Sequence, residues 1–187
     1  MKISAILLAA GLSNRMGKDK LLLKYLEKSL LQHSTDLLLE IPVFERILIT
    51  TDTRSKTLIL PPGICVYIND LPEEGQSRSI KIGVEAATGT HYLFLNADQP
   101  RLTPDDISLL LKSAKNNPEK IIYPVIDSAP CSPAIFPEYF RKDLLNLTGD
   151  DGGRIIRLAN PGLCYEVEVL NPDNFIDIDD EKDYNLL

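Results

Sequence analysis

The sequence has few of the residues that build most metal centres and disulfide frameworks. His33 and His91 are its only histidines, which excludes a histidine-rich metal centre. Its three cysteines, Cys65, Cys131 and Cys164, are far apart and form no CxxC pair. This pattern argues against a zinc site or a disulfide framework and favours a reducing compartment, so we expect a cytoplasmic protein.

Long apolar runs are also missing. No apolar stretch approaches the roughly 20 residues that a membrane-spanning helix needs, so we expect no membrane partner. The first residues, Met1 to Ala5, carry one charged side chain and run into a short apolar stretch, which predicts a first strand and not a signal peptide. Because 187 residues is the usual size of one domain, we expect a single domain over residues 1–187.

Positive charge is scarce over most of the chain. The formal net charge is −7, which argues against a nucleic-acid partner because such a partner needs a basic face. Residues 1–30 hold six cationic and two acidic side chains and so carry +4, which leaves −11 for the remainder. The positive field is therefore concentrated near the N-terminus.

Short apolar runs alternate with amphipathic stretches along almost the whole chain. This alternation predicts strands over residues 2–8, 46–51, 64–68, 92–96, 120–125, 132–136 and 163–170. It predicts helices over residues 29–40, 76–87, 103–116, 137–147 and 151–160. Such an order is typical of βαβ units. We therefore expect an α/β protein with a three-layer α/β/α, Rossmann-like architecture and a mostly parallel central sheet.

The loop after the first predicted strand combines small residues with three cations. It reads Leu8-Ala9-Ala10-Gly11-Leu12-Ser13-Asn14-Arg15-Met16-Gly17-Lys18-Asp19-Lys20. Small residues let backbone N–H groups approach an anion, and the cations add positive charge, so the loop predicts a polyphosphate site. It is not a GxxxxGKS or GxxxxGKT loop, because five residues separate Gly11 from Gly17 and Asp19 follows Lys18. A GxGxxG dinucleotide fingerprint is also missing.

Two further polar segments follow predicted strands, where the ligand crevice of an open α/β sheet lies. The first is Asn96-Ala97-Asp98-Gln99-Pro100, in which Asp98 is a candidate ligand for Mg²⁺; a carboxylate that only caps the turn is the alternative. The second runs from Glu73 to Gly83 and places Gly75, Gln76, Ser77 and Ser79 where a helix begins with free N–H groups. Ordinary helix capping by Ser77 is the alternative there.

Together these segments resemble the motifs of the molybdenum cofactor cytidylyltransferase family, which belongs to the nucleotidyltransferases that release pyrophosphate from a nucleoside triphosphate. The first loop is similar to the signature A-A-G-x-S-x-R-M-G-x-x-K, residues 97–100 to the motif ADQP, and residues 75–83 to a G-x-S-x-S turn that binds the base. The resemblance implies a nucleotidyltransferase fold. It implies that Lys20 and Arg15 are catalytic residues that hold the triphosphate and that Asp98 binds Mg²⁺. It further implies that the nucleotide is bound by Leu8, Ala9, Ala10, Gly11, Gly75, Gln76, Ser77 and Ser79.

The resemblance continues downstream, with two departures. Residues 149–154 are similar to the segment G-D-x-G-G-R, and residues 177–183 to a terminal D-I-D-T-P-E-D motif. This implies acceptor contacts from Asp150, Arg154 and Ser132 and a second metal ligand at Asp179, for which a solvated acidic helix cap is the alternative. Where many members have Gly-His-Pro, this chain has Cys131-Ser132-Pro133, and Glu181 replaces a proline.

The resemblance implies a specific reaction. The acceptor's terminal phosphate attacks the α-phosphorus of a nucleoside triphosphate in line and expels pyrophosphate, while the protein positions the reactants and neutralises charge. Ala10 stands where guanylyl-transferring relatives tend to have a second glycine. We therefore expect CTP and molybdopterin as substrates, with Mg²⁺ as cofactor and a transient contact with a molybdenum hydroxylase apoenzyme as the recipient.

Three alternatives stay open at this point. The chain could use GTP in place of CTP. It could serve another phosphate acceptor, such as a sugar or polyol phosphate. It could also be a delivery chaperone that binds the molybdenum cofactor without catalysis, since fold and motif alone do not establish turnover.

Overall fold

The structure, a computed structural model, describes residues 1–13, 16–60 and 62–187. Arg15 lies outside the described residues. The strands are β1 (Ile3–Ala9), β2 (Lys24–Tyr25), β3 (Lys28–Ser29), β4 (Glu45–Thr50), β5 (Cys65–Ile68), β6 (His91–Asn96), β7 (Ile121–Ile126), β8 (Ala129–Pro130), β9 (Ala134–Pro137) and β10 (Cys164–Glu168).

The α-helices are α1 (Leu30–Glu40), α2 (Asp52–Ser55), α3 (Gln76–Ala86), α4 (Pro104–Asn116), α5 (Arg141–Leu145), α6 (Gly153–Ala159) and α7 (Glu181–Tyr184). Short 3₁₀ turns are η2 (Lys20–Leu22), η3 (Pro72–Glu74), η4 (Glu138–Phe140), η5 (Pro161–Leu163) and η6 (Pro172–Phe175). None of the helices in the part of the chain that the structure describes has the length and apolarity to cross a membrane.

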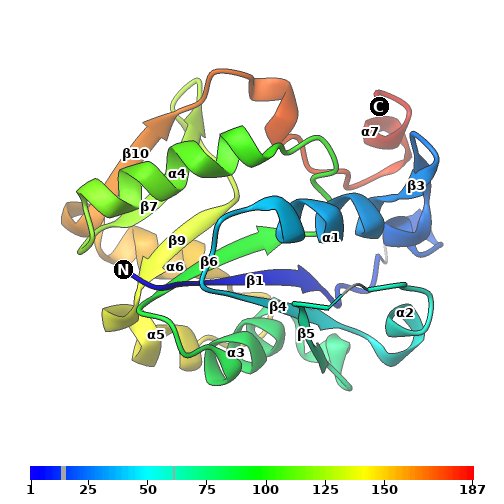
Figure 1. Ribbon diagram of the computed structural model, residues 1–187, viewed down its shortest axis with the longest axis horizontal. Helices are drawn as coiled ribbons and strands as arrows, with labels where there is room; N and C mark the ends of the chain where they lie inside the picture. The colour runs from blue at the N-terminus through cyan, green and yellow to red at the C-terminus, as the bar shows by residue number, and fades with distance from the viewer. Residues whose placement is uncertain (14–15, 61) are drawn as a thin grey trace.

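Within the described residues, eight strands form one sheet in the order β10-β7-β9-β6-β1-β4-β5, with β8 paired to β7 (Figure 1). The central strand β1 is parallel to both of its neighbours, β4 and β6. β9 is antiparallel to β6 and β7, because the eight-residue step from Ile126 to Ala134 is too short for the crossover that a parallel connection needs. The expected mostly parallel α/β sheet is confirmed, with β9 reversed inside it and the short β8 antiparallel to β7.

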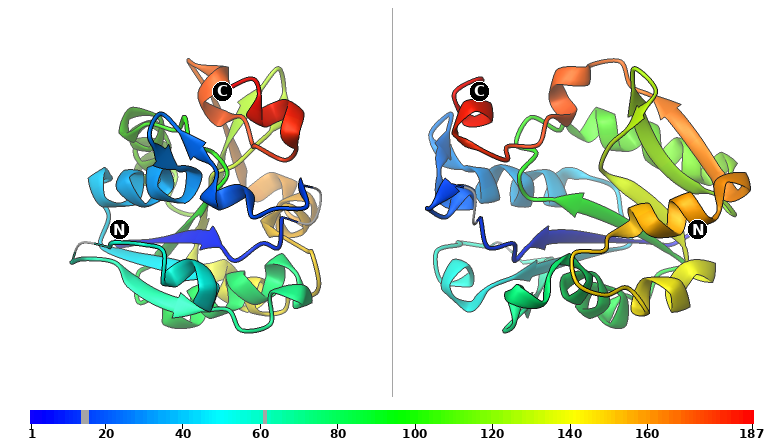
Figure 2. Two further views of the ribbon diagram at one scale, coloured as in Figure 1. Left: turned by 90° about the vertical axis from the view of Figure 1, so that its right-hand side faces the viewer. Right: turned by 180° about the vertical axis from the view of Figure 1, so that it is seen from behind.

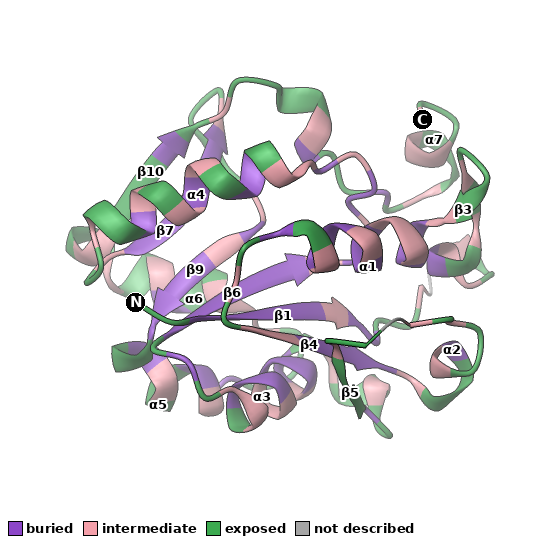
Figure 3. Ribbon diagram, viewed as in Figure 1, coloured by how far each residue is buried: buried purple, intermediate pink, exposed green. Residues whose placement is uncertain are grey.

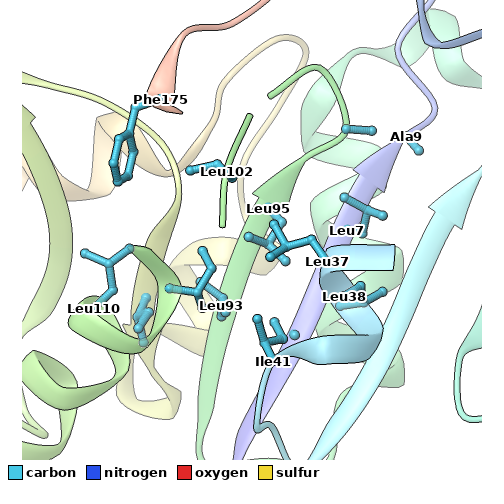
Figure 4. Close-up of a cluster of buried hydrophobic side chains, with 14 of the residues drawn as sticks. Leu7, Ala9, Leu37, Leu38, Ile41, Leu93, Leu95, Leu102, Leu110 and Phe175 are labelled. Atoms are coloured by element: carbon cyan, nitrogen blue, oxygen red, sulfur yellow. The ribbon is translucent and has the colours of Figure 1, made fainter. Parts of the chain in front are cut away.

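The alternation of side chains along β1 divides the interior into two layers. Leu7 belongs to the core cluster under α1 and α4, whereas Ile6 belongs to the cluster under α3, α5 and α6. Figure 4 shows the first cluster, in which Leu110 of α4 lies beside Leu93 and Leu38 of α1 lies on the side of Leu7. The central strands are buried on both faces, and the edge strand β5 is exposed (Figure 3).

Most of the predicted boundaries agree with the structure to within a few residues. Residues 103–116 form α4 with Thr103 as N-cap, and residues 29–40 form α1 with Ser29 as N-cap. The predicted helix over residues 137–147 is instead η4 followed by the short α5. The β2–β3 hairpin and α2 were not predicted, because segments of two to four residues are too short to show a hydrophobic period.

The connections on either side of β1 place the ligand crevice. From β1 the chain passes through α1 to β4, and after β5 it returns through α3 to β6 on the other side of β1. In an open sheet the crevice lies at the carboxyl ends of strands where the order reverses in this way. The crevice is therefore expected beyond the ends of β1 and β6.

The C-terminal segment closes one side of this crevice. The amide of Ile178 donates to the carbonyl of Asp98 at 3.0 Å, and the side chain of Gln99 donates to the carbonyl of Phe175 at 3.0 Å. The helix α7 lies beside the β2–β3 hairpin in Figures 1 and 2, where the Tyr184 hydroxyl donates to the carbonyl of Lys24 at 2.6 Å. Residues from both ends of the chain thus meet at the carboxyl edge of the sheet.

Candidate functional site

A hollow of about 460 Å³ lies at the carboxyl ends of β1 and β6. The loop after β1 forms one wall through Ala10, Gly11 and Leu12. A Cβ at Gly11 would meet no other atom within 4 Å, so the backbone of the loop borders open space at this position. The hollow is also lined by Leu8, Ser13, Lys20, Gly75, Gln76, Ser79, Asn96, Asp98, Asp150 and Asp179.

Lys20 is held between two carboxylates on the wall of this hollow. Its Nζ donates to Oδ2 of Asp98 at 2.8 Å and to Oδ1 of Asp179 at 3.2 Å. Burial alone would lower the pKa of the Lys20 ammonium, but Asp98 and then Asp179 outweigh it and leave the pKa above its ordinary value. Lys20 is therefore a cation at neutral pH, fixed by acids that come from distant parts of the chain.

Asp98 has the geometry of a partly completed cation site. Its Oδ2 accepts from Lys20, whereas its Oδ1 is buried and has no hydrogen-bond partner. A buried carboxylate oxygen without a partner is energetically unfavourable unless a ligand satisfies it. Among the described residues, no three or more His, Cys, Asp or Glu side chains are arranged so that they could together hold a metal ion. Mg²⁺ needs only one or two carboxylates when water and phosphate oxygens complete its shell, so Asp98 and Asp179 fit this ion.

Asp177 adds a third acid close to this pair. Although the residue as a whole is exposed, desolvation of its carboxyl group, followed by repulsion from Asp98 and Asp179, raises the pKa of Asp177 to about 7. A hydrogen bond from Asn96 lowers the pKa in part. The raised pKa shows how unfavourable a further negative charge is at this point, even with Lys20 nearby.

The turn at the start of α3 is locked to the segment that precedes α6. Gly75 has a φ of +87°, and a Cβ there would lie 2.3 Å from the carbonyl oxygen of Gly149. The amide of Ser77 donates to that same carbonyl at 3.0 Å. The Gly149–Asp150 segment lies in direct contact with this turn, and only a glycine at position 75 leaves room for that contact.

A second hollow, of about 490 Å³, adjoins the first. Both hollows are lined by Leu8, Gln76, Asn96 and Asp150. The walls that belong to the second hollow alone are apolar at Phe94 and Phe136 and charged at Arg154, Arg157, Asp151 and Asp177, with Cys131 and Ser132 beside them. Desolvation by burial, followed by the nearby charge of Asp177, raises the pKa of the Cys131 thiol to about 11, so the thiol is protonated at neutral pH.

Ser132 occupies the position where the resemblance leads us to expect a histidine. It contacts Asn96, which lines both hollows. The side chain of Asn96 donates to Oγ of Ser132 at 3.2 Å, and the side chain of Gln99 donates to the carbonyl of Ser132 at 3.2 Å. A short polar chain of Ser132, Asn96 and Asp177 therefore borders the second hollow.

The structure brings most of the residues selected from the sequence to these two hollows. Among the residues that the structure describes, Ala9 and Ser77 are the exceptions: both are buried, at 1% and 3% exposure, and neither lines a hollow. Sequence reasoning missed Asn96, Asp177 and Arg54, although the first two lie inside quoted motifs. Arg54 lies in no motif, and a single arginine in a polar segment gives no local signal of its role.

Comparison with known proteins gives both sequence and fold relatives. A probable molybdenum cofactor guanylyltransferase from Pyrococcus horikoshii is 30% identical over 120 residues, which is 63% of this chain and 59% of that protein. The matched part thus spans less than two thirds of that relative. The molybdenum cofactor cytidylyltransferase from Escherichia coli is 27% identical over 186 residues, which is 97% of this chain and 93% of that protein.

Two solved structures show that the fold is that of the nucleotidyltransferases. A nucleotidyl transferase from Methanothermobacter has a TM-score of 0.82 and 22% identity, over 99% of this chain and 95% of that one. A manganese complex of a Mycobacterium tuberculosis protein has a TM-score of 0.77 and 20% identity, over 100% and 97% of the two chains. The expected nucleotidyltransferase fold is confirmed.

The family model for the MobA-like NTP transferase domain matches residues 5–161. This range includes the loop after β1, the turn at Gly75, Asp98 and the segment up to Arg154, and it ends before Asp177 and Asp179. The chain belongs to the family of MobA-like NTP transferase domains.

Proposed function

We propose that this protein is a Mg²⁺-dependent nucleotidyltransferase that transfers CMP from CTP to molybdopterin and releases pyrophosphate. The observation that carries the proposal is the arrangement of Lys20, Asp98 and Asp179 on the wall of the first hollow. A half-buried cation beside a carboxylate with an unsatisfied oxygen suits a triphosphate and its metal ion.

In the proposed reaction, an oxygen of the acceptor's terminal phosphate attacks the α-phosphorus of the nucleotide. A new P–O bond forms on one side, and the bond to the bridging oxygen of the β-phosphate breaks on the other, so pyrophosphate leaves with the electron pair. Lys20 stabilises the charge that develops on the phosphate oxygens, and the loop at residues 10–13 orients the triphosphate. Asp98 and Asp179 would hold Mg²⁺, which would supply further charge neutralisation.

The two adjoining hollows suit two substrates. The first, with the turn at Gly75, Gln76 and Ser79, would hold the nucleotide. The second has an apolar wall at Phe94 and Phe136 for a ring system and a cation at Arg154 for the acceptor phosphate. Because Asp150 and Asn96 line both hollows, the two reacting groups would meet at their seam.

The choice of CTP is supported by Ala10 and by the similarity to the Escherichia coli cytidylyltransferase over nearly the whole chain. The second candidate is GTP, favoured by the Pyrococcus guanylyltransferase relative. The acceptor is the part of the proposal that depends most on Ser132, since this residue differs from the histidine of the resembling motif.

The direct test is pyrophosphate release from each of the four nucleoside triphosphates, with Mg²⁺, in the presence and absence of the molybdenum cofactor. We expect release from CTP only when the cofactor is present. Release from GTP alone would contradict the choice of base, and release with a sugar or polyol phosphate would contradict the acceptor. Tight binding of nucleotide and cofactor without release would support the delivery chaperone.

Replacing Lys20 by Ala should lower the rate of pyrophosphate release at least 10²-fold, because Lys20 stabilises charge in the transition state. The matched control is Lys24→Ala, which removes an exposed lysine of the neighbouring hairpin and should change the rate little. An unchanged rate for the Lys20 variant would remove this residue from the mechanism.

Asp98→Asn should weaken metal binding in the resting protein, because it replaces the carboxylate that carries the unsatisfied oxygen by a neutral amide. Binding of Mn²⁺ can be measured by electron paramagnetic resonance without any turnover. The same substitution at the exposed Asp173 serves as the control and should leave Mn²⁺ binding unchanged. Equal Mn²⁺ affinity in the wild type and the Asp98 variant would exclude Asp98 as a ligand.

Gly75→Ala should weaken nucleotide binding strongly, because the added Cβ would displace the Gly149 carbonyl and strain a positive φ. Gly162→Ala is a suitable control, since a Cβ there meets no atom within 4 Å. Calorimetric titration with Mg²⁺ and CTP measures both variants. Normal nucleotide affinity in Gly75→Ala would show that the turn does not form part of the nucleotide site.

A further inference from the structure

Arg54 is a buried arginine beside the loop that follows β1, and it contacts both ends of that loop. It lies in α2, and its residue is 3% exposed. The guanidinium donates from Nη1 to the carbonyl of Ala9 at 2.7 Å and from Nη2 to the carbonyl of Gly11 at 2.7 Å. The Nε donates to Oδ2 of Asp19 at 2.6 Å. A single side chain therefore joins the first residues of the loop to the last.

The bonds to Ala9 and Gly11 fix the direction of two peptide groups. In a trans peptide the N–H points opposite to the C=O. Because Arg54 holds the carbonyls of Ala9 and Gly11, the N–H groups of Ala10 and Leu12 point away from the guanidinium. Ala10, Gly11 and Leu12 line the first hollow, and Arg54 itself does not line it.

The bond to Asp19 extends the same control to Lys20. The other oxygen of this carboxylate, Oδ1, accepts from the amide of Leu21 at 3.1 Å and caps the short turn η2. Lys20 is the first residue of that turn. Fixing Asp19 therefore fixes the backbone from which Lys20 reaches Asp98.

Lysine could not replace Arg54 in this role. The guanidinium is planar and presents donors in a fixed fork, whereas an ammonium is a compact charge at the end of a flexible stem. The three N–H donors of the Arg54 guanidinium that are used here each meet an acceptor: two backbone carbonyls and one carboxylate. The pairing with Asp19 also offsets the burial of the charge.

We propose that Arg54 is a positioning residue for polyphosphate binding, which holds the backbone at residues 10–12 and at Lys20 in the geometry that receives the triphosphate. The inference rests on the proposed function only in that it takes the first hollow as the triphosphate site. Arg54 acts through the loop and Lys20 and does not touch the reacting atoms.

The chain offers a matched control in Arg46. Its Nε donates to the carbonyl of Leu38 at 2.7 Å and its Nη2 to the carbonyl of Ile41 at 2.8 Å, at the C-terminal end of α1. Arg46 thus also uses its fork to hold main-chain carbonyls, but at the opposite end of the sheet from the hollow. Arg54→Lys and Arg46→Lys remove comparable hydrogen bonds from the two places.

The experiment compares these two variants with the wild type in three measurements: urea unfolding, calorimetric binding of inorganic tripolyphosphate with Mg²⁺, and pyrophosphate release from CTP with the molybdenum cofactor. We expect both variants to lose stability. Only Arg54→Lys should bind tripolyphosphate at least 10-fold more weakly and release pyrophosphate about 10²-fold more slowly, the effect of small misplacement at a catalytic group. Added guanidinium at millimolar concentration should restore part of the binding to Arg54→Ala but not to Lys20→Ala.

Each outcome decides between the two proposals. Wild-type tripolyphosphate affinity in folded Arg54→Lys, or equal losses of affinity in both variants, would overturn the positioning role. If the wild type binds tripolyphosphate but releases no pyrophosphate from any nucleotide, the transferase activity fails and the role of Arg54 still stands on the binding data. If the wild type does not bind tripolyphosphate, both fail. Should Arg54→Lys not fold, Asp19→Asn keeps the cap on η2 while weakening the contact to Arg54, and we expect the same loss of affinity.

Discussion

The ion pair of Lys20 with Asp98 and Asp179 is the interaction on which the candidate site depends. Three carboxylates, those of Asp98, Asp177 and Asp179, gather at the carboxyl edge of the sheet, where desolvation, followed by repulsion from the other two acids, raises the pKa of Asp177. Lys20 offsets the repulsion between these acids. It pairs with Asp98 and Asp179, which lie 78 and 159 positions after it in the chain. The same ammonium that balances these acids in the resting protein faces the hollow that would receive a polyphosphate, which itself brings negative charge and a cation.

The sheet order makes this ion pair possible. Because the chain leaves β1 on one side and returns to β6 on the other, the loop after β1 and the turn that holds Asp98 lie next to each other. The C-terminal segment then brings Asp179 to the same edge through the bond between Ile178 and the carbonyl of Asp98. Arg54 holds the carbonyls of Ala9 and Gly11 after β1. On another wall of the hollow, Gly75 lies in close contact with Gly149.

Local signals made much of the fold predictable. Thr103, followed by proline and acids, forms a capping box with Asp106 at the start of α4. The apolar strands of the parallel sheet were equally clear because they are buried on both faces. The β2–β3 hairpin, α2 and the reversal at β9 were not predicted, since the first two are too short to show a period and the third depends on which strands become neighbours. Within the site, the motif segments were found, but Arg54 and the acid cluster around Asp177 were not.

The sequence by itself determined that small residues, a glycine and cations follow the first strand, and that a carboxylate follows a later one. These are properties of short segments, in which hydrophobic period and turn chemistry act over a few residues. Only the tertiary structure decided that Lys20 pairs with both Asp98 and Asp179, that Ala9 and Ser77 are buried away from the hollows, and that Arg54 holds the carbonyls of Ala9 and Gly11. These facts depend on distances between side chains, and such distances are set by the order of strands in the sheet and not by spacing along the chain.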